Sequence, residues 1–308
     1  MAKIADDLER ALRRRAREGR PGSADGRSIA QGSGWSVRDV LCTSGPHDRA
    51  FEERHSMVSI AIVVAGSFQY RSTPGCELMT PGSILLGNTG QTFECSHKHG
   101  EGDRCIAFTY NPAFFERIAF DGGVRGPSTD FRPLRLPPLA ATSSIGAQAC
   151  AGLLGSANTS WEELCIKLAA RATQLASGIT PSATTAPPGA TARVTRAVRV
   201  IDSRPSADHR LNELANIAGL SPYHFLRTFE GLTGVTPHQY VIRTRMRHAA
   251  ARLASERGKI IDIALDSGFG DISNFNRTFR ECVRVCGASH EPGQTGQPAK
   301  VSSDRGDV

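Results

Sequence analysis

Short apolar runs separated by turn residues dominate the chain between about residues 35 and 119. Residues 58–65, 84–86 and 105–110 are such runs, and Gly or Pro residues stand between them. Short strands at regular spacing, with turn residues between them, are typical of an antiparallel barrel or sandwich. We therefore predict an antiparallel β domain over residues 35–140.

The pattern becomes helical after this region, over residues 141–179. Within it, residues 160–177 carry apolar side chains at spacings of three and four, which places them on one stripe of a helix. This stripe either packs on the β domain or forms a dimer seam. Packing on the β domain is favoured, because a helix this short lacks the sustained heptads that mark a coiled coil. The stripe consists of Trp161, Leu164, Cys165, Leu168, Ala172 and Leu175.

Three segments have few large apolar residues and are predicted to lie outside the folded domains. Residues 1–34 are rich in Arg and then in Gly and Ser, which predicts a disordered basic tail with at most a frayed helix over residues 5–18. Residues 180–192, rich in Pro and Thr, predict an extended linker. Residues 291–308, rich in Gly, Ser and Asp, predict a second disordered tail.

Residues 193–290 are helical in pattern almost throughout, and they contain an internal repeat. Residues 211–229 can be laid over residues 261–279, fifty positions later. In each copy an alanine precedes a glycine by four positions. The alanine lets two helices approach closely, and glycine adopts a turn conformation that a side chain resists, so each copy predicts a helix-turn-helix unit. These residues are Ala215, Gly219, Ala264 and Gly268.

The second helix of each unit separates residues that pack from residues that face outward. Ser221 and Asp271 are placed to cap these two helices. Two phenylalanines four positions apart then lie on one side of each helix, toward the core. The other faces are free to contact a partner. The core phenylalanines are Phe225, Phe229, Phe275 and Phe279.

Positive charge is concentrated in this helical domain. The chain of 308 residues has a net charge of +7, and residues 193–290 hold 15 Arg and Lys against nine Asp and Glu, a net of +6. A localised basic domain suits double-stranded DNA as a partner. The modest total charge disfavours a nucleoid-type binder without sequence preference.

The chain shows no sign of a membrane or export segment. No window approaches the roughly 18 uninterrupted apolar residues of a membrane span, and the N-terminus lacks the apolar stretch of a secretion signal. We expect a cytoplasmic protein with no membrane partner. Its eight cysteines include no C-x2-C pair, so free thiols are expected in that compartment.

The second unit carries a pattern more specific than a helix-turn-helix alone, formed by Ile263, Ala264, Gly268, Phe269, Phe275 and Phe279. In this pattern the helical domain resembles the DNA-binding domain of the AraC/XylS family of bacterial transcription regulators. The resemblance implies two units, joined by a long helix over about residues 237–254, that enter successive major-groove segments of DNA. It also implies a homodimer and contact with RNA polymerase, as in an activator, while the sign of regulation stays open.

Carried over position by position, the family's base-reading residues fall on the second helix of each unit. Arg227 and Arg277 suit guanine, and Asn276 suits adenine. The alternative is that the arginines touch phosphate, which positions a protein on DNA without reading its sequence. Base contact by at least one arginine is favoured. The implied residues are Tyr223, Leu226, Arg227, Ile272, Ser273, Asn276 and Arg277.

One segment departs from the family's pattern. Within residues 283–290, Arg284 and Gly287 stand where the family tends to have Gly and Pro. This departure predicts a closing helix that is frayed or absent. Whether it impairs the second unit stays open.

The resemblance further implies that the β domain is a cupin-like barrel that binds a small-molecule effector. Enzymatic cupins hold a metal through spaced His and Glu residues. Here those positions fall on Glu53, His55, Ser59 and Phe93, so at most Glu53 and His55 remain as ligands. A metal-dependent enzyme is therefore disfavoured. We predict an effector pocket at Glu53, His55 and Phe93, with an apolar character that Phe93 suits.

Residues 95–105 form a second candidate site. Alternation along a strand places Cys95, His97 and His99 on one face, and Cys105 returns on the neighbouring strand. Two thiols and two imidazoles are a set that zinc accepts. A polar hairpin with two buried thiols and no cofactor is favoured over this metal site, and a thiol switch between Cys95 and Cys105 is a third interpretation.

The sequence thus predicts a multidomain α and β protein, in which a cupin-like antiparallel barrel precedes an all-α domain with two helix-turn-helix units. We expect a sequence-specific DNA-binding transcription regulator that responds to a small-molecule effector and has no enzymatic activity. The alternative is a cupin-type metal-binding enzyme or storage barrel whose helical domain serves assembly.

Overall fold

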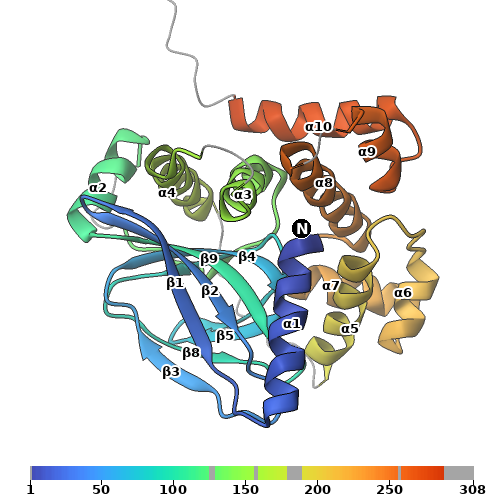
Figure 1. The fold of residues 1–308 in the computed structure, drawn as a ribbon, viewed down its shortest axis with the longest axis horizontal. Coiled ribbons are helices and arrows are strands. Elements are labelled where there is room, and N and C mark those ends of the chain that lie inside the picture. Colours follow the sequence, from blue (N-terminus) through green and yellow to red (C-terminus); the bar gives the residue numbers. More distant parts are fainter. Residues whose placement is uncertain (1, 125–128, 156–158, 179–188, 256–257, 288–308) are drawn as a thin grey trace, which may run out of the picture.

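The computed structural model describes residues 2–124, 129–155, 159–178, 189–255 and 258–287 (Figure 1). The strands are β1 (Ala24–Gly32), β2 (Trp35–Cys42), β3 (Phe51–Arg54), β4 (Val58–Gly66), β5 (Phe68–Ser72), β6 (Gly75–Met79), β7 (Ile84–Gly87), β8 (Thr92–Ser96), β9 (Asp103–Tyr110) and β10 (Arg135–Leu136). The helices are α1 (Ala2–Glu18), α2 (Pro112–Asp121), α3 (Ala140–Leu153), α4 (Trp161–Ser177), α5 (Ala190–Ser203), α6 (Leu211–Ala218), α7 (Pro222–Thr233), α8 (Pro237–Ser255), α9 (Ile260–Asp266) and α10 (Ile272–Gly287). Among these described segments, no helix is both long and apolar enough to cross a membrane.

The strands form two antiparallel sheets, which confirms the predicted β domain. The larger sheet has the order β1-β2-β9-β4-β7-β10, and the smaller has the order β3-β8-β5-β6. Apolar side chains from both sheets pack together in the interior of the domain. This interior cluster consists of Ala61, Val63, Phe68, Tyr70, Met79, Leu85, Cys95, Cys105 and Leu134.

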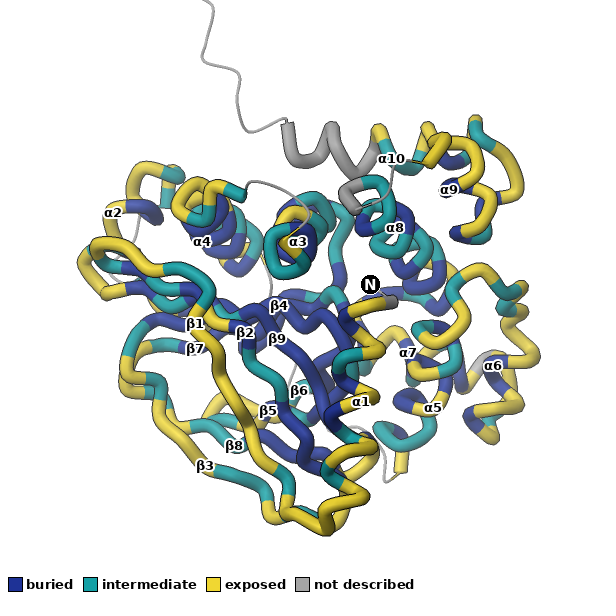
Figure 2. Tube along the Cα trace, in the orientation of Figure 1, coloured by how far each residue is buried: buried dark blue, intermediate teal, exposed yellow. Residues whose placement is uncertain are grey.

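Strand β4 explains why one apolar run in the sequence is continuous instead of alternating. Ile60, Ile62 and Val64 belong to the cluster shared with the helices, whereas Ala61 and Val63 belong to the interior cluster. Because successive side chains of a strand point to opposite faces, both faces of β4 are buried. Figure 2 shows the resulting buried strands beneath α3 and α4.

Helices α3 and α4 cover the outer face of the larger sheet. Leu164, Leu168 and Ala172 of α4 are fully buried in one cluster with strand residues such as Phe108. Tyr110 of β9 donates a hydrogen bond from its hydroxyl to the carbonyl of Cys165 at 3.0 Å. The apolar stripe of α4 therefore packs on the β domain, which is the favoured of the two predicted roles.

The first 34 residues correct the prediction of a disordered tail. Ile4, Leu8 and Ala11 of α1 are buried on the β domain, and β1 pairs antiparallel with β2. Most arginines of α1 are exposed on its other faces. This segment folds because a narrow apolar stripe at helical spacing suffices when a sheet is present to receive it.

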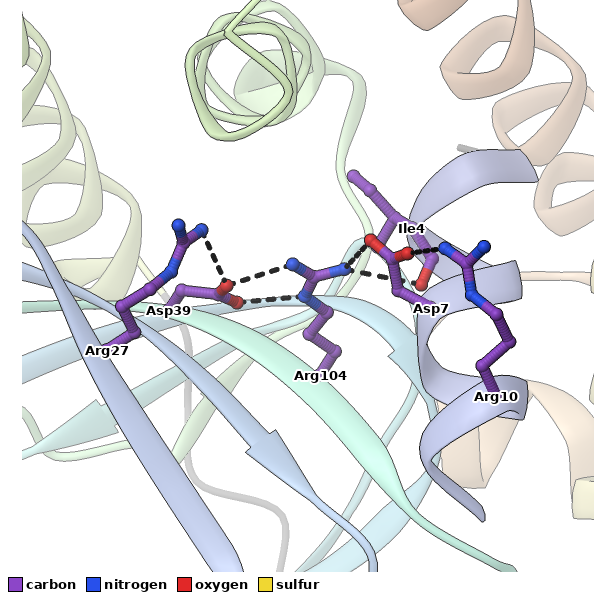
Figure 3. Close-up of polar contacts among 6 residues, drawn as sticks. All are labelled: Ile4, Asp7, Arg10, Arg27, Asp39 and Arg104. Atoms are coloured by element: carbon purple, nitrogen blue, oxygen red, sulfur yellow. Dashed lines mark hydrogen bonds and ion pairs between the residues drawn. The ribbon is translucent and has the colours of Figure 1, made fainter. Parts of the chain in front are cut away.

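Arg104 of β9 joins α1 to the larger sheet (Figure 3). Its guanidinium donates two hydrogen bonds to the Asp39 carboxylate of β2, at 2.8 and 2.9 Å, and one to Asp7 of α1, at 3.0 Å. These partners raise the pKa of Arg104 above its ordinary value. Asp39 also pairs with Arg27 of β1, whose side chain is 69% exposed. The bidentate Asp39–Arg104 pair is buried and strong, whereas the Arg27 contact is screened by solvent.

The predicted linker and C-terminal tail lie largely outside the described residues, 179–188 and 288–308 respectively. The all-α domain begins with α5, at Ala190. It contains two hydrophobic clusters, one around Phe225 and Phe229 and one around Phe269 and Phe275. The domain of two helical units that the repeat predicts is therefore confirmed.

We expect Asp39→Asn to lower the free energy of unfolding by about 3 kcal/mol, because it leaves a buried guanidinium without its main counter-charge. Arg27→Gln is the matched control, since it removes the exposed partner of the same carboxylate and should cost less than about 1 kcal/mol. Urea unfolding followed by circular dichroism measures both values. Equal losses in the two variants would contradict a special role for the buried pair.

Candidate DNA-binding interface

The first helix-turn-helix unit consists of α6 and α7. Ala215 is fully buried between them, and Gly219 ends α6 with φ +63, a left-handed conformation that favours glycine. Ser221 caps α7, because its side-chain oxygen accepts a hydrogen bond from the backbone N–H of His224. Phe225 and Phe229 are fully buried. The local residue pattern thus produces the predicted turn and core.

The second unit, α9 and α10, repeats this construction. Ala264 is fully buried, and Gly268 has φ +91. A Cβ at Gly268 would lie 2.7 Å from the Cα of Ser206, so the turn also requires glycine for space. Asp271 caps α10 by accepting a hydrogen bond from the N–H of Asn274 at 2.7 Å. Helix α10 continues to Gly287, through most of the segment that departs from the family's pattern.

The residues predicted to read bases lie on α7 and α10, and most of them face solvent. Arg227, Ser273, Asn276 and Arg277 are exposed, whereas Leu226 and Ile272 are half-buried. The side chain of Tyr223 lies outside the described part of the chain. Arg277 donates a hydrogen bond to the side-chain oxygen of Asn274 at 3.0 Å, which orients its guanidinium at the helix surface.

Three arginines of the joining helix α8 turn toward the protein instead of outward. Arg243 donates a hydrogen bond to the carbonyl of Pro138, and Arg245 donates to the carbonyls of Pro205 and Ala207, at 3.0 and 2.9 Å. Arg247 forms an ion pair with Asp202 of α5 at 3.4 Å. The positive charge of α8 therefore serves partly to hold neighbouring segments together.

Asp202 links α5 to α8 through a polar cluster. Its carboxylate accepts hydrogen bonds from the hydroxyls of Tyr240, at 3.1 Å, and Thr244, at 3.3 Å. Burial raises the pKa of Asp202 to about 6, although Arg247 and the two hydroxyls act in the opposite direction. This cluster fixes the joining helix on the first helix of its domain.

Both helix-turn-helix units pack against the N-terminal domain. Leu78 of β6 belongs to the hydrophobic cluster of the first unit. Buried Arg135 of β10 forms an ion pair with Glu77 at 3.0 Å and donates a hydrogen bond to the carbonyl of Thr233, at the end of α7, at 2.8 Å. On the other side, α3 packs against both α8 and α10. The two units therefore contact the N-terminal part of the chain at two different places, and each leaves one face of its second helix, α7 or α10, exposed.

The predicted effector residues are only partly brought together. His55 stacks on Phe93 with ring centroids 4.2 Å apart, and it shares a hydrogen bond of 2.8 Å with the hydroxyl of Tyr70. Burial lowers the pKa of His55 to about 4, so the imidazole is neutral at pH 7. Glu53 lies opposite Phe93 in the strand register but is exposed. The three residues do not form the ligand set of an enzymatic cupin.

The Cys/His segment differs from its predicted arrangement in one residue. Cys95, His97 and Cys105 are buried, but His99 is exposed. Burial, together with the nearby carboxylate of Asp103, raises the pKa of the Cys95 and Cys105 thiols well above the usual range, which disfavours reactive thiolates.

Two other residues approach His97 in place of His99, namely Cys42 and Asp103. They are Cα partners in the β2–β9 ladder. Asp103 lies within residues 95–105 but is not among the ligands predicted there, whereas Cys42 is distant in the sequence and meets it only through the β2–β9 pairing, which the sequence alone could not assign.

Comparisons with known proteins bear on the C-terminal part of the chain. Residues 214–286 match a family model described as a helix-turn-helix domain. The HTH-type transcriptional regulator Rv1931c of Mycobacterium tuberculosis is 36% identical over 82 residues, which are 27% of this chain and 32% of that protein. The regulatory protein PocR of Salmonella typhimurium is 34% identical over 93 residues, 30% of this chain and 31% of that protein. The chain thus spans about a third of the length of these curated relatives.

A solved structure from Chromobacterium violaceum, described as a transcriptional regulator with an AraC-type DNA-binding domain, is also similar. It is 23% identical and covers 34% of this chain and 98% of its own, with a TM-score of 0.29. The match to the family model, over residues 214–286, spans α7, α8, α9 and most of α6 and α10, and so covers both units. Residues 214–286 therefore form a helix-turn-helix domain similar to those of transcription regulators.

Proposed function

We propose that the protein is a sequence-specific DNA-binding regulator of transcription, and that its N-terminal domain responds to an effector. The observation that carries this proposal is the pair of helix-turn-helix units whose second helices expose Arg227, Asn276 and Arg277. Arginine can contact guanine and asparagine can contact adenine through paired hydrogen bonds in the major groove. Two such helices are suited to two neighbouring groove segments.

The contacts between domains support an influence of the N-terminal domain on DNA binding. The first unit rests on β6 and Arg135, and the second rests on α3. A ligand that binds one arrangement of these contacts more tightly than another shifts the population toward it. A homodimer, contact with RNA polymerase and a cytoplasmic location belong to the same proposal and are implied by the family resemblance.

The cupin-type enzyme or storage barrel is the weaker alternative. Its ligand positions are occupied by exposed Glu53, by His55 bonded to Tyr70, and by Phe93. The homologous regulators also indicate a role other than catalysis. We therefore propose that the β domain has a sensory role.

Selection of bound sequences from a random duplex library, with the full-length protein at physiological salt, tests the proposed function. We expect a motif of two parts whose centres are about one helical turn, roughly 10 base pairs, apart. A motif of half this length would mean that only one unit reads DNA. Absence of any enriched motif would contradict sequence-specific binding.

We expect Arg277→Ala to weaken binding to the selected site by about 1–3 kcal/mol and to relax the preference at one base position. Arg71→Ala is the matched control, because Arg71 is an exposed arginine on β5 of the barrel, and it should leave the affinity unchanged. Fluorescence anisotropy on the selected site and on random duplex measures both effects. If Arg277→Ala weakens binding equally on the two duplexes, the arginine contacts phosphate only.

A further inference from the structure

Three side chains with different metal-binding chemistry meet in the interior of the β domain. The ligand atoms of Cys42, His97 and Asp103 all lie within 4.8 Å of one another, and all three residues are buried. Cys42 ends β2 and Asp103 begins β9, where the two are direct partners in the ladder. His97 follows the last residue of β8. The cluster therefore draws on two paired strands and on the loop after a third, and it belongs to neither the DNA-reading helices nor the predicted effector residues.

The hydrogen bonding of His97 is incomplete for a buried imidazole. Its Nε2 shares a hydrogen bond of 2.7 Å with Asp103 Oδ1, and the Cys42 thiol also interacts with the ring, but Nδ1 makes no hydrogen bond of good geometry among the described residues. The His97 side chain is 1% exposed. Buried polar atoms in folded proteins nearly always have a partner, so an unbonded ring nitrogen next to a thiol and a carboxylate points to a ligand.

A fourth donor lies next to the same carboxylate. The thiol of Cys105 donates a hydrogen bond to Asp103 Oδ2 at 3.3 Å, from the inner face of β9. Sulfur, imidazole nitrogen and carboxylate oxygen are the ligands of zinc, and bonds of about 2.0–2.3 Å in a tetrahedron place ligand atoms roughly 3–4 Å apart. The Cys42 thiolate and the Asp103 carboxylate together balance the charge of a divalent cation, and a Cys105 thiolate would add one negative charge.

The hairpin that carries His97 and Asp103 has a shape enforced by glycines. Gly102, at φ +62, donates a backbone hydrogen bond to the carbonyl of Ser44 at 2.8 Å, and Gly100 donates one to the carbonyl of His97 at 3.0 Å. A Cβ at Gly66 would lie 2.2 Å from the carbonyl oxygen of Gly102. The loop is thus packed tightly onto the neighbouring strand, and its two ligand residues are held before any ion arrives.

We propose that Cys42, His97 and Asp103, with Cys105 as the fourth donor, form a binding site for one divalent transition-metal ion of the zinc class. The site differs from the set Cys95, His97, His99 and Cys105, which is the less favoured interpretation of this segment from the sequence. It differs from an enzymatic cupin centre both in its residues and in its position at the end of β2 and the start of β9.

Cobalt(II) provides a spectroscopic probe of this site in the full-length, chelator-treated protein. We expect one equivalent of Co²⁺ to give thiolate-to-cobalt charge-transfer absorption and the intense visible bands of a tetrahedral ion, and Zn²⁺ to displace it. Cys42→Ser should abolish most of the charge-transfer absorption, and His97→Gln should weaken binding by more than about a hundredfold. His99→Gln, at the exposed neighbouring histidine, and Cys150→Ser, at a buried thiol of α3, are matched controls that should bind as tightly as the original chain.

X-ray absorption by the zinc-loaded original protein identifies the ligands without any substitution, which covers the case in which a variant fails to fold. At least one sulfur at about 2.3 Å supports the site. The proposed site would be overturned if the zinc ligands were oxygen and nitrogen alone, or if no stoichiometric binding were found. It would also be overturned if binding were lost only in His99→Gln.

The same hairpin lies beside the DNA-binding domain, which suggests how metal occupancy could act. A Cβ at Gly100 would come within 3.3 Å of the guanidinium of Arg199 on α5. If the proposed regulator function holds, we expect Zn²⁺ to change the affinity for the selected DNA site several-fold in the original protein and not in Cys42→Ser. If cobalt binds with the expected absorption bands but Zn²⁺ leaves the DNA affinity unchanged, the metal site stands and only its effect on DNA binding is contradicted. The two results are independent because the cobalt spectrum is measured without DNA.

Discussion

Strand β9 is buried on both faces, and most of the N-terminal domain depends on that constraint. Its outward residues contact helices: Arg104 binds Asp7 of α1, and Tyr110 binds the backbone of α4. Its inward residues Asp103 and Cys105 lie in the interior with His97. Successive side chains of a strand point to opposite faces, so β9 contacts the helices with one face and contributes to the polar cluster with the other. The charged residues on either face are paired, as burial requires.

Arginine has two different roles in this chain, and burial distinguishes them. Arg135, Arg243 and Arg245 donate hydrogen bonds to backbone carbonyls of segments distant in sequence. A guanidinium has several donors in one plane, so a single side chain can satisfy carbonyls at the ends of helices and loops that would otherwise lack partners. Net charge alone therefore overestimates the surface available to DNA. Arg227 and Arg277, the two arginines proposed to read bases, are among those that stay exposed.

The sequence predicts best those features that local residues determine. The helix-turn-helix units follow from an alanine, a glycine and a cap within a few positions of one another, as at Ala264, Gly268 and Asp271. Strand β1 could not be predicted in this way, because all nine of its residues are exposed or half-buried and it forms through its pairing with β2. The Cys42–Asp103 pair is likewise a product of strand register. Register depends on the whole sheet, so no short window contains it.

The second helices of the two units, α7 and α10, are held against the N-terminal part of the chain by different contacts. If α8 alone joined the units, their relative position would depend on one helix. Here the first unit is also held by β6 and Arg135, and the second is also held by α3. Any shift of α3 relative to the barrel would therefore move α10 relative to α7. Under the proposed function, binding to two groove segments requires one relative position of these helices, so a small change within the N-terminal domain would have a direct physical route to DNA affinity.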